Sequence, residues 1–160
     1  MAVDYFLKLD GIPGESTDAK HKGEIDVLAF SWGVSRAGSS GPGGGGGAGK
    51  AIFEDLLVVA RTSNASPKLW HTCATGQHLK TAVLACRKGS GKGQVEFLKI
   101  TLSDVTITSY EIDGSDEELP LDQIALAFAR VETEFVSVDA TGKAQPPVKS
   151  GWDLKKNAKV

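Results

Sequence analysis

The sequence predicts a mainly β fold: a compact barrel of about eight strands with one α-helix on its outside. Apolar and polar residues alternate over most of the 160 residues, which is the period of a strand with one buried face. In two places the alternation slips by one residue, as it does at a β-bulge, and bulges bend a sheet towards closure. One segment carries the start and stop signals of a helix. The length suits a single domain, residues 1–160, with a core of its own.

Three strands are predicted in the first part of the chain. The first, at 3–9, has apolar residues at every second position and ends at a Gly-Ile-Pro-Gly turn. The second, at 25–35, changes parity because its apolar set passes from Val27 directly to Leu28, which predicts a bulge. The third strand occupies 52–61.

The helix is predicted to start near Ser66. Serine is a favourable N-cap, and Pro67 fits the first helical position, where its missing N–H is not needed. Gly76 is expected to end the helix. The apolar stripe predicted to face the core consists of Leu69, Trp70, Cys73 and Ala74.

The second half of the chain alternates more regularly. Its predicted elements are a strand, a hairpin loop, a long strand, a polar loop, a last long strand and a C-terminal tail, at 80–87, 88–93, 95–112, 113–118, 124–138 and 139–160. In the first long strand the apolar positions shift by one residue at Ser103 and Asp104, which predicts a second bulge or a tight corner. A sheet of this size is expected to hide its edges by closing or by pairing with another chain.

Composition and charge exclude several classes of protein. The 18 basic residues nearly balance the 20 acidic ones, so no basic surface for nucleic acid or an anionic membrane is expected. No stretch approaches a membrane span, and the N-terminus lacks the basic and apolar parts of a signal peptide. We expect folding in the cytoplasm, which leaves open export by a route without a cleaved signal. Cys73 and Cys86 have no further cysteines to form a zinc site and fit two reduced thiols.

Residues 38–50 hold eight of the 19 glycines and separate two predicted strands. Ordering a glycine costs about 0.5–1 kcal/mol more than ordering an alanine, so such a loop is expected where a partner orders it. The same stretch imitates a phosphate-binding loop, because Gly44, Gly49 and Lys50 have its spacing. However, Ala51 stands where magnesium needs a hydroxyl, and a strand follows where phosphate binding needs a helix. We interpret 38–50 as an extended contact loop.

No group of residues predicts catalysis, a cofactor or a metal. His71 and His78 could share a helix face, but no third ligand follows at metal spacing, and His21 falls in a loop. No serine lies in a strand-to-helix nucleophile elbow. The acidic residues at 113–118 lack the alternating ligands of a calcium loop. The sequence is that of a building block and not of an enzyme.

Several segments, in order along the whole chain, resemble one protein family. They are 2–4 with 14–16, 25–33, the glycine run up to Lys50, 66–69 with 76–78, 98–102, and 151–153. The family is the hemolysin-coregulated proteins (Hcp), the tube subunits of bacterial type VI secretion systems. The resemblance is weakest at 113–121, a loop in which members of the family differ.

The resemblance implies a β-barrel with one helix that assembles into homohexameric rings, which stack into a tube. A contractile sheath drives this tube out of the cell together with a spike protein at its tip. The subunit is itself exported, so it is cytoplasmic before assembly and extracellular afterwards. The ring lumen carries or chaperones effector proteins. The implied partners are therefore copies of the chain, the spike, the sheath and effectors, with no nucleic acid and no membrane insertion.

The resemblance also implies roles for individual residues. It implies that Ser31 points to the lumen, although an ordinary outward-facing strand serine has the same parity. By that parity Leu28, Phe30 and Trp32 share the opposite, inward face. The residues implied to contact a neighbouring subunit or ring are Gly43, Gly44, Gly45, Gly46, Gly47, Gly49 and Lys50.

Two alternatives to a tube subunit remain at this stage. A lipocalin-like carrier of small molecules would be a monomer with a cavity in its barrel. Against it, the large inward residues Leu98, Ile100, Phe128 and Trp32 predict a filled interior. A nucleotide hydrolase would use Lys50, and Lys50→Ala would then abolish nucleotide binding.

Overall fold

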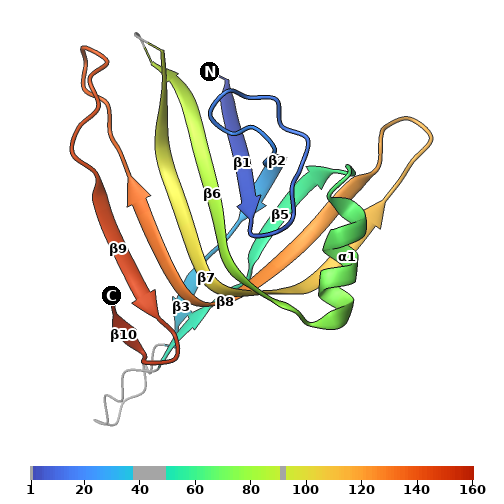
Figure 1. The fold of residues 1–160 in the computed structure, drawn as a ribbon. Coiled ribbons are helices and arrows are strands. Elements are labelled where there is room, and N and C mark those ends of the chain that lie inside the picture. The colour runs from blue at the N-terminus through green and yellow to red at the C-terminus, as the bar shows by residue number, and fades with distance from the viewer. Residues whose placement is uncertain (1, 38–49, 91–92) are drawn as a thin grey trace.

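A strongly curved antiparallel sheet makes up most of the molecule (Figure 1). The computed structural model describes residues 2–37, 50–90 and 93–160. Its elements are β1 (Val3–Leu9), β2 (Ile25–Ser31), β3 (Val34–Arg36), β4 (Ala51–Phe53), β5 (Leu56–Arg61), α1 (Ser66–Thr75), β6 (His78–Ser90), β7 (Gly93–Asp113), β8 (Leu121–Phe135), β9 (Val148–Asp153) and β10 (Ala158–Lys159). The predicted mainly β fold with a helix is confirmed, with ten described strands where about eight were expected.

Pairing of β7 with β8 closes six strands into a barrel. Their order is β8-β5-β2-β1-β6-β7, and neighbours are antiparallel throughout. The other edge of β8 pairs with β5 over 121–126 and with β9 over 130–135. Consequently β9 and β10 extend the sheet beyond the barrel, and the predicted C-terminal tail contains two strands.

Aliphatic side chains fill the inside of the barrel. Because side chains alternate along a strand, Leu56 and Val58 point inward while Leu57 between them is half exposed. The largest fully buried apolar side chains are Leu7, Leu56, Leu69, Leu84, Leu102, Ile107, Ile124 and Leu126. Of the residues predicted to fill the interior, Ile100 is buried, and Leu98, Phe128 and Trp32 pack against the core from half-buried positions.

The helix α1 begins and packs differently from the prediction. Its N-cap is Ala65, which makes no side-chain cap bond, because the Ser66 hydroxyl instead donates to the buried carboxylate of Asp122. The helix ends as predicted at Gly76, whose φ of 69° is the left-handed conformation that glycine adopts easily. The predicted stripe is wrong at Trp70, which is 52% exposed, and at Ala74, which is also exposed. The helix residues that are buried are Ser66, Leu69 and Thr72.

Both predicted changes of parity are present, but only the first of them is a β-bulge. The register of β2 with β5 shifts between Val27 and Ala29. The extra residue of that shift is Leu28, which is 42% exposed, so the prediction that it shares the inward face with Phe30 is wrong. In β7 the parity changes at Asp104, which has a φ of 54°, but the ladders with β6 and β8 keep their register there, so this is a tight corner and not a bulge. The register of β7 with β8 shifts farther along, between Ile107 and Ser109.

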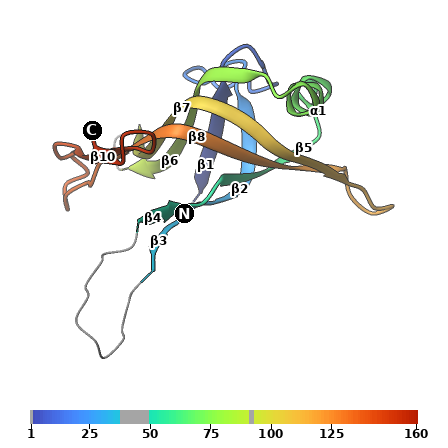
Figure 2. The ribbon, with the colours of Figure 1, turned by 90° about the horizontal axis from the view of Figure 1, so that it is seen from below.

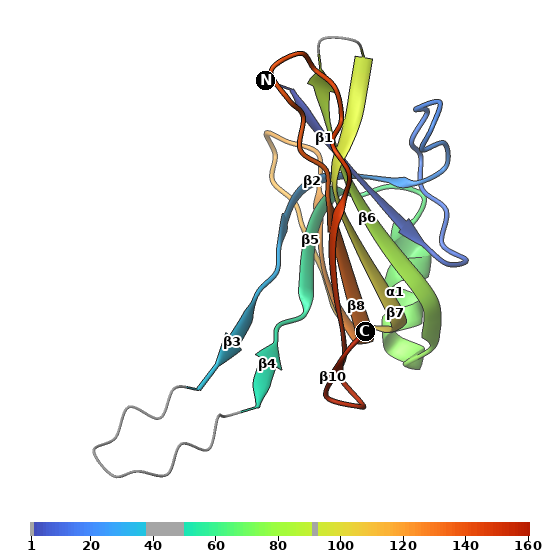
Figure 3. The ribbon, with the colours of Figure 1, turned by 90° about the vertical axis from the view of Figure 1, so that its left-hand side faces the viewer.

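The predicted strands at 25–35 and 52–61 are each interrupted. The breaks lie at 32–33 and 54–55, and they separate β3 and β4 from the barrel strands. Within the described residues β3 and β4 pair with each other, and Figures 2 and 3 show them projecting from the barrel as an arm. The Glu54 amide donates to the Gly33 carbonyl at 3.0 Å, which joins the two breaks.

Candidate functional site

A shallow trough crosses the outward face of β2, β5, β8 and β7. It lies between two rows of cross-strand neighbours, which are Ser31, Leu57, Ala125 and Ser109 in one row and Ala29, Val59, Gln123 and Glu111 in the next. Half of these side chains are alanine or serine, which project only a short distance from the backbone and leave the surface hollow. The trough has a volume of about 390 Å³.

The floor of the trough is held in place from behind. The inward neighbours of the trough residues are core side chains such as Val58 and Ile124, so the sheet cannot shift without disturbing the core. The Thr108 hydroxyl donates to the Asp55 carboxylate at 2.7 Å and fixes the edge of the floor. This is a firm, open surface that suits contact with a protein better than enclosure of a small molecule.

Ser31 lies in this trough. The residue is exposed, and its neighbours Phe30 and Trp32 are half-buried against the core, as the parity of the strand predicted. The prediction that Ser31 faces the lumen of a ring concerns an assembly and stays a prediction.

Aromatic rings join the base of the arm to β9. Trp32 stacks on Phe53 and Phe53 on Trp152, each pair with ring centroids 6.3 Å apart. Together with Val131 these rings line an apolar recess of about 190 Å³. The orientation of the arm formed by β3 and β4 is therefore set by its contact with β9.

The loop predicted to contact neighbours lies largely outside the described residues. That is the case for Gly43, Gly44, Gly45, Gly46, Gly47 and Gly49. Lys50 is described: it is exposed and directly precedes β4. The contact role of this loop remains a prediction.

Comparison with known proteins decides the family. The family described as "Type VI secretion system effector, Hcp" matches residues 6–135. The chain is 43% identical to Protein hcp1 of Pseudomonas aeruginosa over 162 residues, which cover 100% of both chains. The chain belongs to the Hcp family.

Solved structures agree with this Hcp assignment. A structure of a type six secretion system protein matches with a TM-score of 0.93 at 33% identity, over 99% of this chain and 100% of that one. Hcp1 from Salmonella typhimurium matches with a TM-score of 0.83 at 33% identity over 100% of each chain. A type VI secretion system effector from Yersinia pestis matches with a TM-score of 0.77 at 32% identity, over 94% and 99%.

This Hcp chain has a covered corner, residues 13–24 over β1 and β6, that sequence reasoning did not find. His21 was predicted only as a loop residue, but it is 7% exposed and stacks on Phe6 with ring centroids 4.3 Å apart. Its Nε2 lies 2.6 Å from Glu96, and its Nδ1 lies 3.0 Å from Glu24. Glu24 and Glu96 are far apart in the sequence, so no local sequence pattern predicts that both contact His21.

Arg87 also contacts Phe6 and completes the covered corner. Its guanidinium lies 4.8 Å from the ring centroid and donates to Asp18 at 2.6 Å and to Asp4 at 3.1 Å. The hydrogen bond from Arg87 holds the pKa of Asp18 well below its ordinary value. The corner is thus a stack of charged and aromatic groups that pair with one another, in which the buried Arg87 Nε has no hydrogen-bond partner among the described residues.

The other histidines form no metal site. His78 does not share a helix face with His71 but begins β6, where its Nδ1 lies 2.7 Å from Asp104. The hydrogen bonds from His78 and Lys155 lower the pKa of Asp104. In the described part of the chain, no group of three or more histidines, cysteines or carboxylates could hold a metal ion.

A buried carboxylate ties α1 to the barrel of this Hcp. Asp122 is 1% exposed and accepts hydrogen bonds from the hydroxyls of Thr62 at 2.9 Å, Tyr110 at 2.8 Å and Ser66. Burial is the main cause of a raised pKa at Tyr110. No sequence pattern predicts the pairing of Ser66 with Asp122, because the two residues belong to separate elements.

The protonation state of one cysteine follows from its burial. Cys73 and Cys86 are free thiols, and burial raises the pKa of Cys86 to about 11, so this thiol is protonated at neutral pH. Among the described residues, no helix has the length and apolar character needed to cross a membrane.

Proposed function

We propose that this chain is the structural tube subunit of a type VI secretion system. Six copies form a ring, rings stack into a tube, and the trough around Ser31 faces the lumen. The contractile sheath expels the tube with its spike, and effectors travel in the lumen against the trough. The observation that carries this proposal is a firm surface of small side chains left uncovered on a barrel whose interior is already filled.

Physical requirements of a ring support the proposal. A closed ring of six needs head-to-tail contacts between two different surfaces of one subunit. A standard stable contact buries about 1,600 Å² in total, which only outer faces and loops can supply here. A lumen of small, mostly uncharged side chains suits passage of different proteins, because it offers few strong interactions to any one of them.

The filled interior weighs against a small-molecule carrier of the lipocalin kind. Leu56, Leu102 and Leu126 occupy the barrel where such a carrier would hold its ligand. Lys50 likewise weighs against nucleotide hydrolysis. It is followed by β4, whereas a phosphate-binding lysine is followed by the N-terminus of a helix.

The ring is tested first. Size exclusion with light scattering should give six times the mass of the chain, and negative-stain microscopy should show a six-fold annulus. Purified protein that remains a monomer at high concentration and retains a bound small molecule would contradict the proposal and favour the carrier.

The role of the trough is tested with Ser31→Phe. A phenylalanine at this position fills the trough without touching the core, so rings should still form. Binding of a co-expressed effector of the same secretion system should weaken by about tenfold, equivalent to about 1.4 kcal/mol. Ser137→Phe is the matched control, because Ser137 is an exposed serine beyond the far end of β8. Equal effector binding by both variants would remove the trough from the mechanism.

A further inference from the structure

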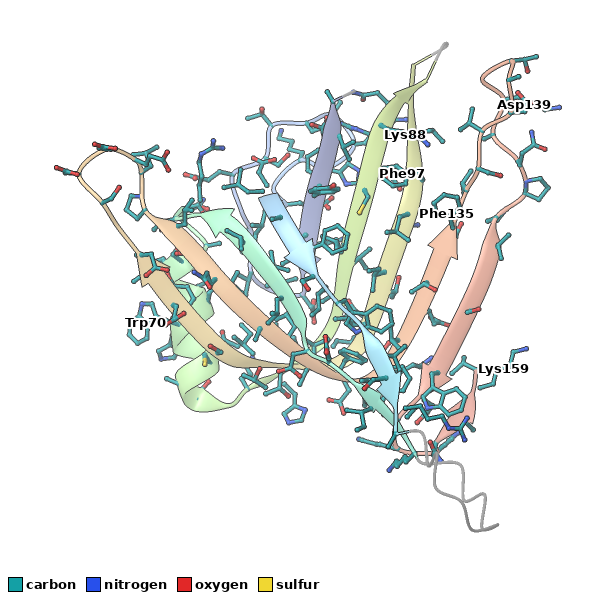
Figure 4. The ribbon with its side chains drawn as sticks, turned by 180° about the vertical axis from the view of Figure 1, so that it is seen from behind. Trp70, Lys88, Phe97, Phe135, Asp139 and Lys159 are labelled. Carbon is teal, nitrogen blue, oxygen red and sulfur yellow. The ribbon has the colours of Figure 1, made fainter. Side chains whose placement is uncertain are left out.

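The cover, residues 13–24, buries none of its apolar side chains. The only apolar side chains in it are those of Pro13 and Ala19, and both are exposed. Figure 1 shows the cover in front of β1 and β2, and in the reverse view of Figure 4 it lies behind them. Because burial of apolar surface is the usual source of attachment, polar and charged contacts must hold this segment on the barrel.

The backbone of the cover bonds to itself. The Gly14 amide donates to the Gly23 carbonyl and the Gly23 amide donates to the Ser16 carbonyl, each at 2.8 Å. The Ser16 amide donates to the Glu24 carbonyl at 3.0 Å. These hydrogen bonds keep the shape of the cover but do not join it to β1 or β6. Side chains provide the ties to the barrel.

His21 makes one of these ties with both nitrogens of its ring. Its Nδ1 lies 3.0 and 3.1 Å from the two carboxylate oxygens of Glu24, and its Nε2 lies 2.6 Å from Glu96 on β7. A neutral imidazole has one N–H and an imidazolium has two, whereas an ionised carboxylate can only accept hydrogen bonds. Both contacts are therefore favourable only when both ring nitrogens carry a proton. The geometry of the closed cover requires the charged form of His21.

The surroundings of the ring make this proton count important. The charged groups around the ring, next to it in the sequence, or joined to it through Phe6 are Glu24, Asp18, Lys20, Lys22, Glu96, Arg87 and Asp4. Arg87 pairs with both aspartates, and the two lysines are exposed. Only the two glutamates remain to face His21, whose side chain is 8% exposed. Without the second proton, this poorly solvated place would hold two carboxylates and no cation between them.

We propose that the second proton on His21 is a latch for the cover. With two ring protons, His21 joins Glu24 to Glu96, and the cover is closed over Phe6, which is 4% exposed. When the imidazolium gives one proton to water, one ring nitrogen keeps its N–H and the other presents a lone pair to a carboxylate. That contact becomes repulsive, residues 20–24 leave β7, and the Phe6 ring is uncovered. The inference concerns the single subunit and does not depend on the proposed ring.

The test measures protonation and opening together on the full chain. Isotope labelling of histidine alone gives ring-nitrogen resonances from His21, His71 and His78, and replacement of each by glutamine assigns them. The measurements run from about pH 5 to about pH 9, where ordinary carboxylates stay ionised. His21 should lose its second proton within this interval. The protection of the amides of 13–24 from hydrogen exchange, corrected for the intrinsic effect of pH, should fall about tenfold with the same midpoint. Protection in β7 and β8 should not change.

Substitutions of His21 and of its partner sharpen the test. Arginine is always charged, donates to two carboxylates and stacks on aromatic rings, so His21→Arg should keep the cover protected at every pH. His21→Gln brings no charge, so protection should be low at every pH. Glu96→Gln should weaken the pH response, because its amide can accept from a protonated ring nitrogen and donate to an unprotonated one.

His78→Gln is the matched control. His78 is an exposed histidine whose Nδ1 pairs with Asp104 outside the cover, so this variant should respond to pH as the wild type does. Wild-type protection in β7 and β8 shows for each variant that the barrel is folded.

Three results would overturn the latch. In the first, His21 loses its second proton and the protection of 13–24 stays the same. In the second, His21 carries the same number of ring protons over the whole pH interval. In the third, His21→Gln shows the protection and the pH response of the wild type.

Discussion

The outward face of the barrel differs between its two halves. Over β1 and β6 it is covered by residues 13–24, which place His21 on Phe6 and Asp18 on Arg87. Over β2, β5, β8 and β7 it carries the trough and is exposed along most of its length. Both halves belong to one continuous sheet, so the backbone does not cause the difference.

The difference between the two halves comes from their side chains. It is costly to leave large charged and aromatic side chains partly desolvated without partners. In the first half of the face, residues 13–24 of the same chain supply those partners. Small side chains need no such partner, and the second half remains accessible to another protein. The contrast separates surface that completes the fold from surface that is free to bind.

The largest effect should come from two adjacent leucines of β5. Leu56→Ala should destabilise the fold by about 2–5 kcal/mol, because Leu56 is fully buried and its loss leaves a cavity. Leu57→Ala should change stability by less than about 1 kcal/mol, because Leu57 is 50% exposed in the trough. Urea unfolding of the two variants under non-associating conditions measures both values. Equal losses would mean that the trough is part of the core.

A smaller effect is expected in the covered corner from Gly14→Ala. A Cβ at Gly14 would lie 2.5 Å from the Glu24 carbonyl oxygen, so residues 13–24 would have to move off the barrel. We expect a loss of about 1–3 kcal/mol, measured by thermal unfolding. The control is Gly89→Ala, where an added Cβ has nothing within 4 Å. A neutral Gly14→Ala would show that the cover is loosely attached.

The smallest effect should be a pH dependence of the covered corner. Because Arg87 lowers the pKa of Asp18 below its ordinary value of 3.8, the ionised carboxylate stabilises the fold. That contribution is present above about pH 4 and is lost as the pH falls below it. Asp18→Asn should therefore flatten the decline in melting temperature between about pH 4 and about pH 2. Identical slopes for the variant and the wild type would exclude a role of this ion pair in stability.

The local parts of the fold were predictable because their causes are local. Strand periodicity placed β1 and β7, the parity change after Val27 placed a bulge, and Gly76 ended the helix. Ser31 was placed on the outward face by the same alternation.

The missed features depend on contacts between distant segments. Ser66 has the residue type of an N-cap, yet its hydroxyl donates to Asp122 of β8, which is 56 positions away in the sequence. His21 is buried by Glu96, which lies on β7. Trp70 follows helical periodicity, but α1 covers only the end of the barrel and leaves this ring in solvent. A residue pattern within one helix or strand does not predict which other helix or strand will pack against it.

The stacked rings at the base of the arm have a consequence for the order of events during synthesis. Trp32 and Phe53 emerge from the ribosome well before Trp152, which supports Phe53 and lies 99 positions after it in the sequence (152 − 53). The direction of the arm is therefore set only after β9 has been made. A nascent chain that still lacks β9 cannot hold its arm in the final orientation.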